Sequence, residues 1–212
     1  MNLIDIKSLS KVNISELLKA EGQPNYRGNQ IYLWLVKGVC RFDDMLNIPK
    51  DLRNKLKEKC YIATAKTERK LVSKHDGTIK YLFKLYDGEF VESVVMKYKH
   101  GYTICISTQV GCKMNCQFCA TGNSGFSRNL TASEMLAQIQ TAQIDNHIKI
   151  SNVVLMGMGE PLDNYDNVIQ FLKLVSSEDN LNIGMRHISL STCGIINKIY
   201  DLANENLQLT LS

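Results

Sequence analysis

The 212-residue sequence predicts an α/β fold in three parts, and three observations support this. Apolar residues recur at helical spacing in the first part, Asp-Gly pairs separate alternating apolar runs in the second, and strand and helix patterns alternate in the third. We therefore expect a small helical domain at residues 1–65, an antiparallel β-meander at 66–100 and a parallel β/α region at 101–212.

The first part is expected to contain three short helices. Ile14 and Leu18 share one helical face, residues 28–37 form an amphipathic segment, and Pro49 opens a third helix. The meander that follows is expected to have strands at residues 68–73, 78–85 and 90–97. Asp76-Gly77 and Asp87-Gly88 separate these strands, and Asp-Gly between alternating apolar runs is a strong hairpin signal.

The third part is expected to form parallel β/α units, because strand and helix patterns alternate there. Ligands in such folds bind at the carboxyl ends of the strands, so the loops that follow the strands should form one active site. The chain ends at Ser212, at the last expected strand, and an open edge there suggests a fragment of a larger β/α domain. The strands are expected at residues 102–107, 152–156, 187–191 and 207–211, and the helices at 132–143, 167–175 and 195–203.

Charge is divided unevenly along the chain. Residues 1–100 carry 19 Lys and Arg against 12 Asp and Glu, a net charge of +7, whereas residues 101–212 carry 6 against 9, a net charge of −3. The basic half is typical of a surface that binds a polyanion such as RNA. A lysine-rich helical surface in contact with solvent explains the same charge equally well.

Localisation is predicted to be cytoplasmic. No apolar run approaches the roughly 20 residues that span a bilayer, and the N-terminus lacks the basic-then-apolar pattern of a signal peptide. The seven cysteines are odd in number and three of them are clustered, which favours a reducing compartment over disulfide pairing. We therefore expect no membrane association.

Cys112, Cys116 and Cys119 form a C-x3-C-x2-C motif with Phe118 before the last cysteine. Three thiolates leave a metal centre one ligand short, whereas a structural zinc site needs four ligands. A [4Fe–4S] cluster on three cysteines keeps one iron free, and the spacing resembles that of the radical S-adenosylmethionine (SAM) enzymes. A zinc-stabilised RNA-binding module, with Cys105 as the fourth ligand, is the alternative from a different class.

Several further motifs extend the resemblance to essentially the whole chain, namely Glu92–Tyr98, Cys105–Cys112, Arg128–Thr131, Gly157–Leu162 and Leu190–Gly194. Together they resemble the dual-specificity 23S rRNA and tRNA adenine-C2 methyltransferases. The resemblance implies an N-terminal RNA-contacting helical domain and the first half of a radical-SAM partial (β/α)6 barrel, with a [4Fe–4S] cluster and SAM as cofactors. It also implies methylation of carbon 2 of adenine through a methyl-cysteine intermediate.

The same resemblance assigns roles to individual residues near the cofactors. Cys112, Cys116 and Cys119 would hold the cluster, and Phe118 would pack near the adenine of SAM. SAM would also contact Gly159 and Glu160, and the serines Ser191 and Ser212. Each of these residues also has a simpler explanation. Phe118 could be a loop aromatic that fills the core, Gly159 and Glu160 could form a plain strand-to-loop turn, and the two serines could be ordinary turn or cap residues.

Two residues are assigned to the methyl transfer itself. Cys105 would form a transient disulfide with a distant C-terminal cysteine, and Glu92 would accept a proton. The simpler explanations are that Cys105 is a buried strand cysteine and that Glu92 is a solvent-facing carboxylate. Cys40, Cys60 and Cys193 have no partner at metal-ligand spacing and are predicted to be structural.

The resemblance implies 23S rRNA and tRNA as substrates, an electron donor such as flavodoxin or ferredoxin, and a monomer. Because the methyl-carrying cysteine lies outside these 212 residues, we expect the chain to be inactive alone. A related branch that methylates carbon 8 of adenine and confers antibiotic resistance shares the cluster motif. Pro161 and the Ser191–Gly194 run favour the carbon-2 branch.

Overall fold

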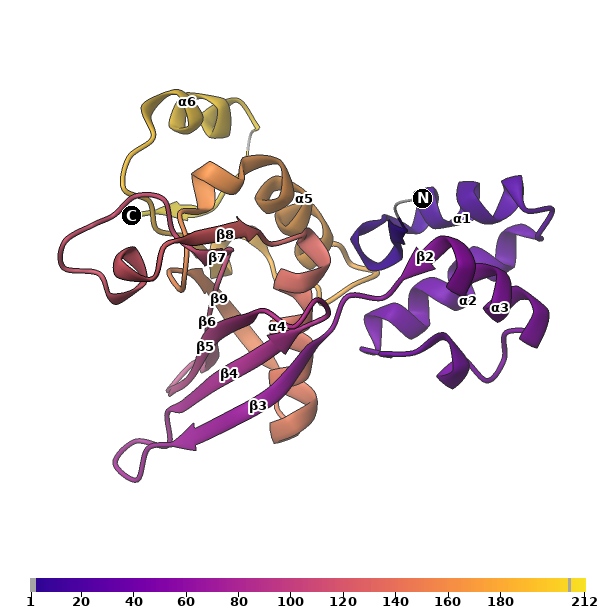
Figure 1. The fold of residues 1–212 in the computed structure, drawn as a ribbon, viewed down its shortest axis with the longest axis horizontal. Coiled ribbons are helices and arrows are strands. Elements are labelled where there is room, and N and C mark those ends of the chain that lie inside the picture. Colours follow the sequence, from indigo (N-terminus) through magenta and orange to yellow (C-terminus); the bar gives the residue numbers. More distant parts are fainter. Residues whose placement is uncertain (1–2, 206) are drawn as a thin grey trace. The chain divides into compact units, whose positions relative to one another are not determined.

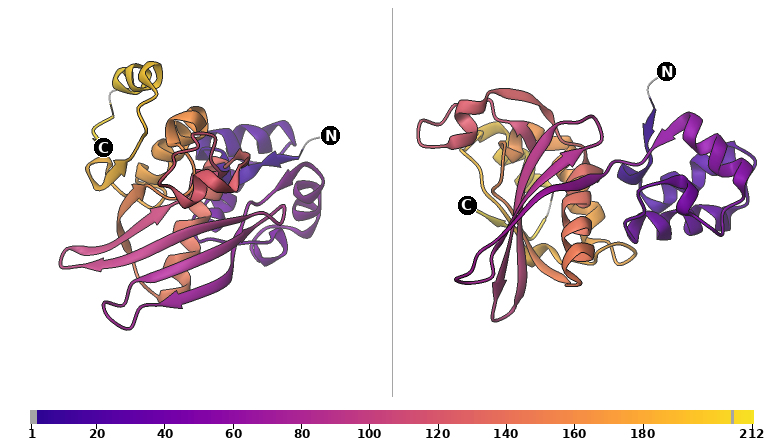
Figure 2. Two further views of the ribbon diagram at one scale, coloured as in Figure 1. Left: turned by 60° about the vertical axis from the view of Figure 1, so that its left-hand side comes forward. Right: turned by 60° about the horizontal axis from the view of Figure 1, so that its bottom comes forward.

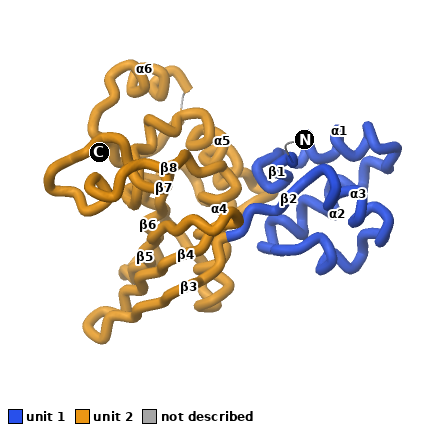
Figure 3. Tube along the Cα trace, viewed as in Figure 1, with its two compact units in different colours: residues 1–64 blue, residues 65–212 orange. Residues whose placement is uncertain are grey.

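In the computed structural model, residues 3–205 and 207–212 are described (Figure 1). The chain forms two compact units, with the boundary between Thr64 and Ala65 (Figure 3). No helix in the described part of the chain is long and apolar enough to cross a membrane.

Unit 1, which ends at Thr64, is helical as the sequence predicts. The three expected helices are α1 (Lys11–Ala20), α2 (Asn25–Val36) and α3 (Lys50–Lys59). The 3-10 turn η1 (Ile6–Ser8) precedes α1, and η2 (Phe42–Asp44) lies between α2 and α3. A short parallel pair, β1 (Ile4–Asp5) with β2 (Cys60–Tyr61), was not predicted, because two residues are too few to show a strand period. The helices bury one apolar core, formed by Ile14, Leu18, Ile31, Leu35, Leu52, Leu56 and their neighbours.

Unit 2 is built on one seven-stranded sheet. The strands of the expected meander pair antiparallel with one another and with β6, and from β6 onward the neighbouring strands are parallel. Residues 66–100 therefore share a sheet with the β/α region. The order is β11 (Thr210–Leu211), β10 (Ile188–Leu190), β9 (Ile150–Leu155), β6 (Gly101–Ile106), β5 (Phe90–Tyr98), β4 (Ile79–Leu85) and β3 (Ala65–Val72).

Helices α4 (Ala132–Asn146) and α5 (Tyr165–Ser176) pack on one face of this sheet (Figures 1 and 2). Helix α6 (Ile196–Asn204) adds Leu202 to the same core. Helix α4 begins with a capping box in which Thr131 and Glu134 exchange hydrogen bonds with each other's backbone. The alternation of strand and helix, with helices that connect parallel neighbours, agrees with the predicted α/β fold and with half of a barrel.

The carboxyl ends of the parallel strands lie level with one another. Leu155 of β9 is in register with Ile106 of β6 and with Leu190 of β10, which in turn pairs with Leu211. Beyond β6, the hairpin of β7 (Gln109–Gly111) and β8 (Phe126–Asn129) encloses the cysteine motif and the turn η3 (Ala120–Ser124). The turns η4 (Pro161–Asn164) and η5 (Met185–His187) lie beyond β9 and before β10.

Candidate functional site

The segments that follow the parallel strands meet at one edge of the sheet, as predicted. We call this edge, at the carboxyl ends of the parallel strands, the rim. The backbone N–H of Gly157 donates to Ile106 O at 3.0 Å, that of Ser191 to Leu155 O at 3.1 Å, and that of Ser212 to Leu190 O at 2.9 Å. Each strand end is thus joined to the segment beyond its neighbour. This rim brings together the cysteine loop, the 157–163 turn and the 191–194 turn.

The cysteine loop is held tightly by its own backbone. Cys112 N–H donates to Gly125 O at 2.8 Å and Cys119 N–H donates to Cys116 O at 3.0 Å. A Cβ on Gly122 would lie 2.9 Å from Cys116 O, so only glycine fits at that position. The three predicted ligands are half-buried and reachable from solvent.

The donor chemistry of this loop fits an iron–sulfur cluster. Among residues 3–205 and 207–212, no three His, Cys, Asp or Glu side chains are gathered closely enough to hold a metal ion as they stand. However, Met114 N–H lies 3.5 Å from Cys112 Sγ, and hydrogen bonds from the backbones of Gly122 and Thr121 lower the pKa of the Cys119 thiol. Amide hydrogen bonds to sulfur stabilise the thiolate form that metals bind.

Glu160 is the central acceptor of the rim and is almost fully buried. Its carboxylate accepts hydrogen bonds from Leu162 N–H at 2.9 Å, from Thr192 Oγ1 at 2.7 Å and from Cys193 N–H at 2.8 Å. A carboxylate has about four acceptor positions, and a hydrogen bond from the Cys193 side chain adds a fourth contact. These contacts join the turn after β9 to the turn after β10.

Gly159 is required by packing. Its φ is +97°, and a Cβ there would lie 2.5 Å from the Cβ of Gln109. The buried Gln109 accepts from Glu160 N–H at 2.9 Å and donates to Asp163 at 2.7 Å. Asp163 also pairs with Lys113 of the cysteine loop at 2.9 Å. Although burial opposes ionisation of Asp163, the hydrogen bonds from Lys113 and Gln109 lower its pKa.

The other predicted SAM contacts lie at the same rim with different exposure. Ser191 is half-buried directly after β10, and Ser212 is exposed directly after β11. The carbonyl oxygen of Ser212 accepts from Thr192 N–H at 2.9 Å. The side chain of Phe118 is 94% exposed, so it does not fill the core.

Cys105 and Glu92 lie on the sheet face that points away from the helices. Cys105 of β6 is half-buried, and this burial raises the pKa of its thiol. A hydrogen bond from Met156 N–H lowers that pKa by a smaller amount. Glu92 of β5 is exposed and pairs with Lys80 of β4 at 2.9 Å. Neither residue lies in the cysteine loop.

Cys193 is a rim residue that the sequence analysis treated as structural. Partial burial, the hydrogen bond and charge of Glu160, and the nearby Cys116 raise the pKa of its thiol to about 11. Its thiol therefore lies beside both the buried carboxylate and the cysteine loop. The signal that could have identified it is its position two residues after the Ser191 strand end.

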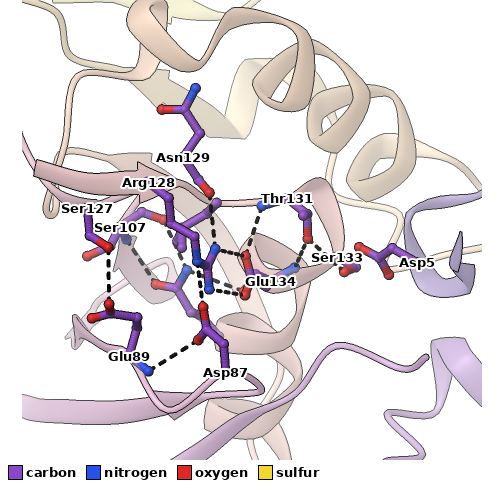
Figure 4. Close-up of polar contacts among 12 residues, drawn as sticks. Asp5, Asp87, Glu89, Ser107, Ser127, Arg128, Asn129, Thr131, Ser133 and Glu134 are labelled. Atoms are coloured by element: carbon purple, nitrogen blue, oxygen red, sulfur yellow. Dashed lines mark hydrogen bonds and ion pairs between the residues drawn. The ribbon is translucent and has the colours of Figure 1, made fainter. Parts of the chain in front are cut away.

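Arg128 joins three segments around the cysteine loop (Figure 4). From β8 it donates to Asp87 in the β4–β5 turn at 2.7 Å and to both carboxylate oxygens of Glu134 at 2.8 Å. The hydrogen bond from Arg128 lowers the pKa of Asp87. Next to it, Ser127 donates to Glu89 in the same turn at 3.0 Å.

Two family profiles match the chain. The profile described as "Radical SAM superfamily" matches residues 106–211, which include the strand-end rim. The profile described as "Ribosomal RNA large subunit methyltransferase N-terminal domain" matches residues 1–62, which correspond to unit 1.

Individual relatives match nearly every residue. Curated proteins named "Probable dual-specificity RNA methyltransferase RlmN" are 50% identical over 211 residues in Clostridium tetani and 52% identical over 212 residues in Alkaliphilus oremlandii. Both alignments cover 100% of this chain but only 60% and 62% of the relative. A crystal structure of a radical SAM methyltransferase from Sphaerobacter thermophilus superposes with a TM-score of 0.89 at 37% identity, and covers 98% of this chain and 62% of that one.

Proposed function

Because the chain belongs to the radical SAM superfamily, we propose that it forms part of a methyltransferase that adds a methyl group to carbon 2 of adenine in 23S rRNA and tRNA. The observation that carries this proposal is the meeting of the cysteine loop, the 157–163 turn and the 191–194 turn at one rim. The methyltransferase profile over unit 1 and the relatives' names support the RNA substrate.

Cys112, Cys116 and Cys119 would hold a [4Fe–4S] cluster at this rim. When bound, the cluster and SAM supply the radical chemistry that carbon 2 of adenine needs, because that carbon is not nucleophilic. Glu160 would accept a hydrogen bond from the ammonium group of SAM in place of the one from the Cys193 thiol. Gly159, Ser191, Ser212 and Phe118 would line the same cofactor.

Cys105 and Glu92 would take part in the methyl transfer to the substrate RNA and would not bind the cofactors. The burial that raises the pKa of Cys105 keeps it a neutral thiol until a base removes its proton, and thiol exchange requires the thiolate. Glu92 is solvent-accessible and ionisable, as a proton acceptor must be. The enzyme would be a cytoplasmic monomer. A flavodoxin or ferredoxin would supply its electrons.

Anaerobic reconstitution of this chain with iron and sulfide tests the cofactor assignment. We expect a brown protein with about four iron and four sulfide per chain, and an electron paramagnetic resonance signal that changes when SAM is added. A colourless protein with one tightly bound zinc would instead identify the zinc-stabilised RNA-binding module.

The site of methylation needs the part of the relatives that this chain does not cover. A chimera of residues 1–212 with the remaining part of the Alkaliphilus oremlandii relative supplies it. Mass spectrometry of rRNA and tRNA treated with the chimera should find 2-methyladenine. Methylation at carbon 8 would assign the protein to the antibiotic-resistance branch, and this chain alone should methylate neither RNA.

A further inference from the structure

The outer strands of the unit 2 sheet carry a group of cations that the rim does not use. We call it the basic face and define it as Lys66, Arg69, Lys80 and Lys84. Lys66 pairs across the strands with Lys84, and Arg69 pairs with Leu82. Residues paired in this way point to the same side of a sheet. The core-facing residues of β4 alternate with these, so the basic face points away from α4, which lies behind these strands in Figure 1.

The basic face is continuous with the residues predicted to act on the substrate. In one row across the sheet, Leu71 pairs with Lys80, Lys80 with Val94, and Val94 with Cys105. In the neighbouring row Leu82 pairs with Glu92. Neighbouring strands lie about 4.8 Å apart, so Lys80 lies roughly 10 Å from Cys105 along the row.

Most of this positive charge is not neutralised within the protein. Lys80 pairs with Glu92, but Lys66, Arg69 and Lys84 have no ion-pair partner within the residues that the structure describes. All three are exposed on their strands. Lys84 also lies 5.7 Å from the centre of the Phe90 ring, which is 40% exposed. The face therefore combines unpaired cations with accessible apolar and aromatic side chains.

We propose that the basic face binds the phosphate backbone of the substrate RNA and so presents the target adenine to Cys105 and Glu92. The inference rests on the proposed function and adds to it a surface in unit 2 that contacts RNA. Sheet faces that carry basic and aromatic side chains suit single-stranded RNA, because phosphates meet the cations while bases stack on the rings. An acidic electron donor would fit the charge too, but its target is the cysteine loop, whereas this face leads to Cys105.

Fluorescence anisotropy with a short labelled RNA stem-loop that has an adenine in its loop tests the proposal. The test variant is the triple substitution Lys66→Gln, Arg69→Gln and Lys84→Gln. The control removes the same charge from other parts of unit 2 through Lys149→Gln before β9, Lys173→Gln in α5 and Lys198→Gln in α6. Circular dichroism and thermal melting verify that both variants are folded.

We expect the basic-face variant to bind RNA about tenfold more weakly than the wild type at low salt, and the control to bind within about twofold of it. Each phosphate contact contributes about 0.7–0.9 to the slope of log affinity against log salt, so that slope should fall by about two to three in the basic-face variant alone. Equal losses in both triple variants, or no loss in either, would overturn the inference.

Two additional measurements separate this inference from the proposed function. Iron and sulfide are measured after anaerobic reconstitution of all three proteins, because cluster assembly does not depend on the basic face. Unchanged RNA binding by a basic-face variant that assembles its cluster overturns the surface and leaves the proposed function standing. If RNA binding is unchanged but binding of an acidic flavodoxin falls, the face binds a protein partner instead.

Discussion

Arg128 binds the carboxylate of Glu134 through two hydrogen bonds of 2.8 Å, from Nη1 to Oε2 and from Nη2 to Oε1 (Figure 4). The same carboxylate accepts from Thr131 N–H at 3.0 Å and so also caps α4. This two-point arrangement fixes the direction of Arg128 as well as its distance. The strand that leaves the cysteine loop is thereby joined to the start of the helix that follows it.

Arg128→Met should lower the free energy of unfolding by about 3 kcal/mol. The side chain of Glu134 is only 5% exposed, and removal of its partner would leave a buried charge unpaired. Lys173→Met, which breaks the solvent-exposed pair with Glu205, should cost less than about 1 kcal/mol. Chemical denaturation of the full chain, followed by circular dichroism, measures both, and similar losses would contradict the structural role of Arg128.

Gly159→Ala should be more destabilising than Gly88→Ala. Both glycines have φ near +95°, so both alanines bear a similar backbone cost of about 1 kcal/mol. Only at Gly159 does the new Cβ meet another atom, the Cβ of Gln109 at 2.5 Å, whereas nothing lies within 4 Å at Gly88. Thermal denaturation of the two variants should therefore give clearly different midpoints. Equal midpoints would show that Gln109 moves aside freely.

Lys7 should make unit 1 more stable as the pH rises above 8. Burial lowers the pKa of Lys7 from 10.5 to about 8, although Cys40 and Asp5 act in the opposite direction. Between these two values the unfolded chain binds the proton and the folded chain does not, so the free energy of unfolding increases with pH. The gain should be about 2 kcal/mol between about pH 8 and about pH 9.5.

Comparison with Lys7→Met isolates this effect. Burial raises the pKa of Cys60 to about 11, which lowers stability over part of the same range, but Cys60 is present in both proteins. Trp34, the only tryptophan, lies in α2 and reports the unfolding of unit 1. The difference between the two proteins should change with pH in favour of the wild type, and a constant difference would argue against a neutral buried Lys7.

Replacement of any one of Cys112, Cys116 and Cys119 by alanine should abolish stable iron uptake in anaerobic reconstitution. Two thiolates cannot hold a cluster that already lacks a fourth protein ligand. Cys40→Ala is the matched control, because Cys40 is exposed and lies in unit 1, and it should retain about four iron per chain. Iron analysis and the visible absorption spectrum measure the outcome. Full iron retention in the Cys116→Ala protein would point to a ligand outside the motif, for which Cys193 is a candidate because it interacts electrostatically with Cys116.

The order of the helices and strands could be predicted from the sequence better than the pairing of the strands into one sheet. Asp-Gly turns and apolar periods are local signals, so the meander and the β/α region were both identified. The pairing of β6 with β9, which makes the meander and the β/α region one sheet, depends on residues far apart in the chain, such as Ile106 and Leu155. The same reason explains the site: Glu160 and Cys112 were found by motif, whereas the contacts of Glu160 with Cys193 and of Arg128 with Asp87 exist only in the folded chain.

The turn between β5 and β6 decides which side of the sheet Cys105 faces. Tyr98 pairs with Gly101, so only Lys99 and His100 form this turn, and a Cβ at Gly101 would lie 2.2 Å from Ser151 Oγ. Side chains alternate along a strand, and a shift of one residue exchanges the two faces. A shift of β6 by one residue, with β5 held in place, would turn the Cys105 thiol toward α4 and move Ile104 and Ile106 out of the core. The chain would keep every proposed cluster ligand and lose the thiol that is proposed to meet the substrate.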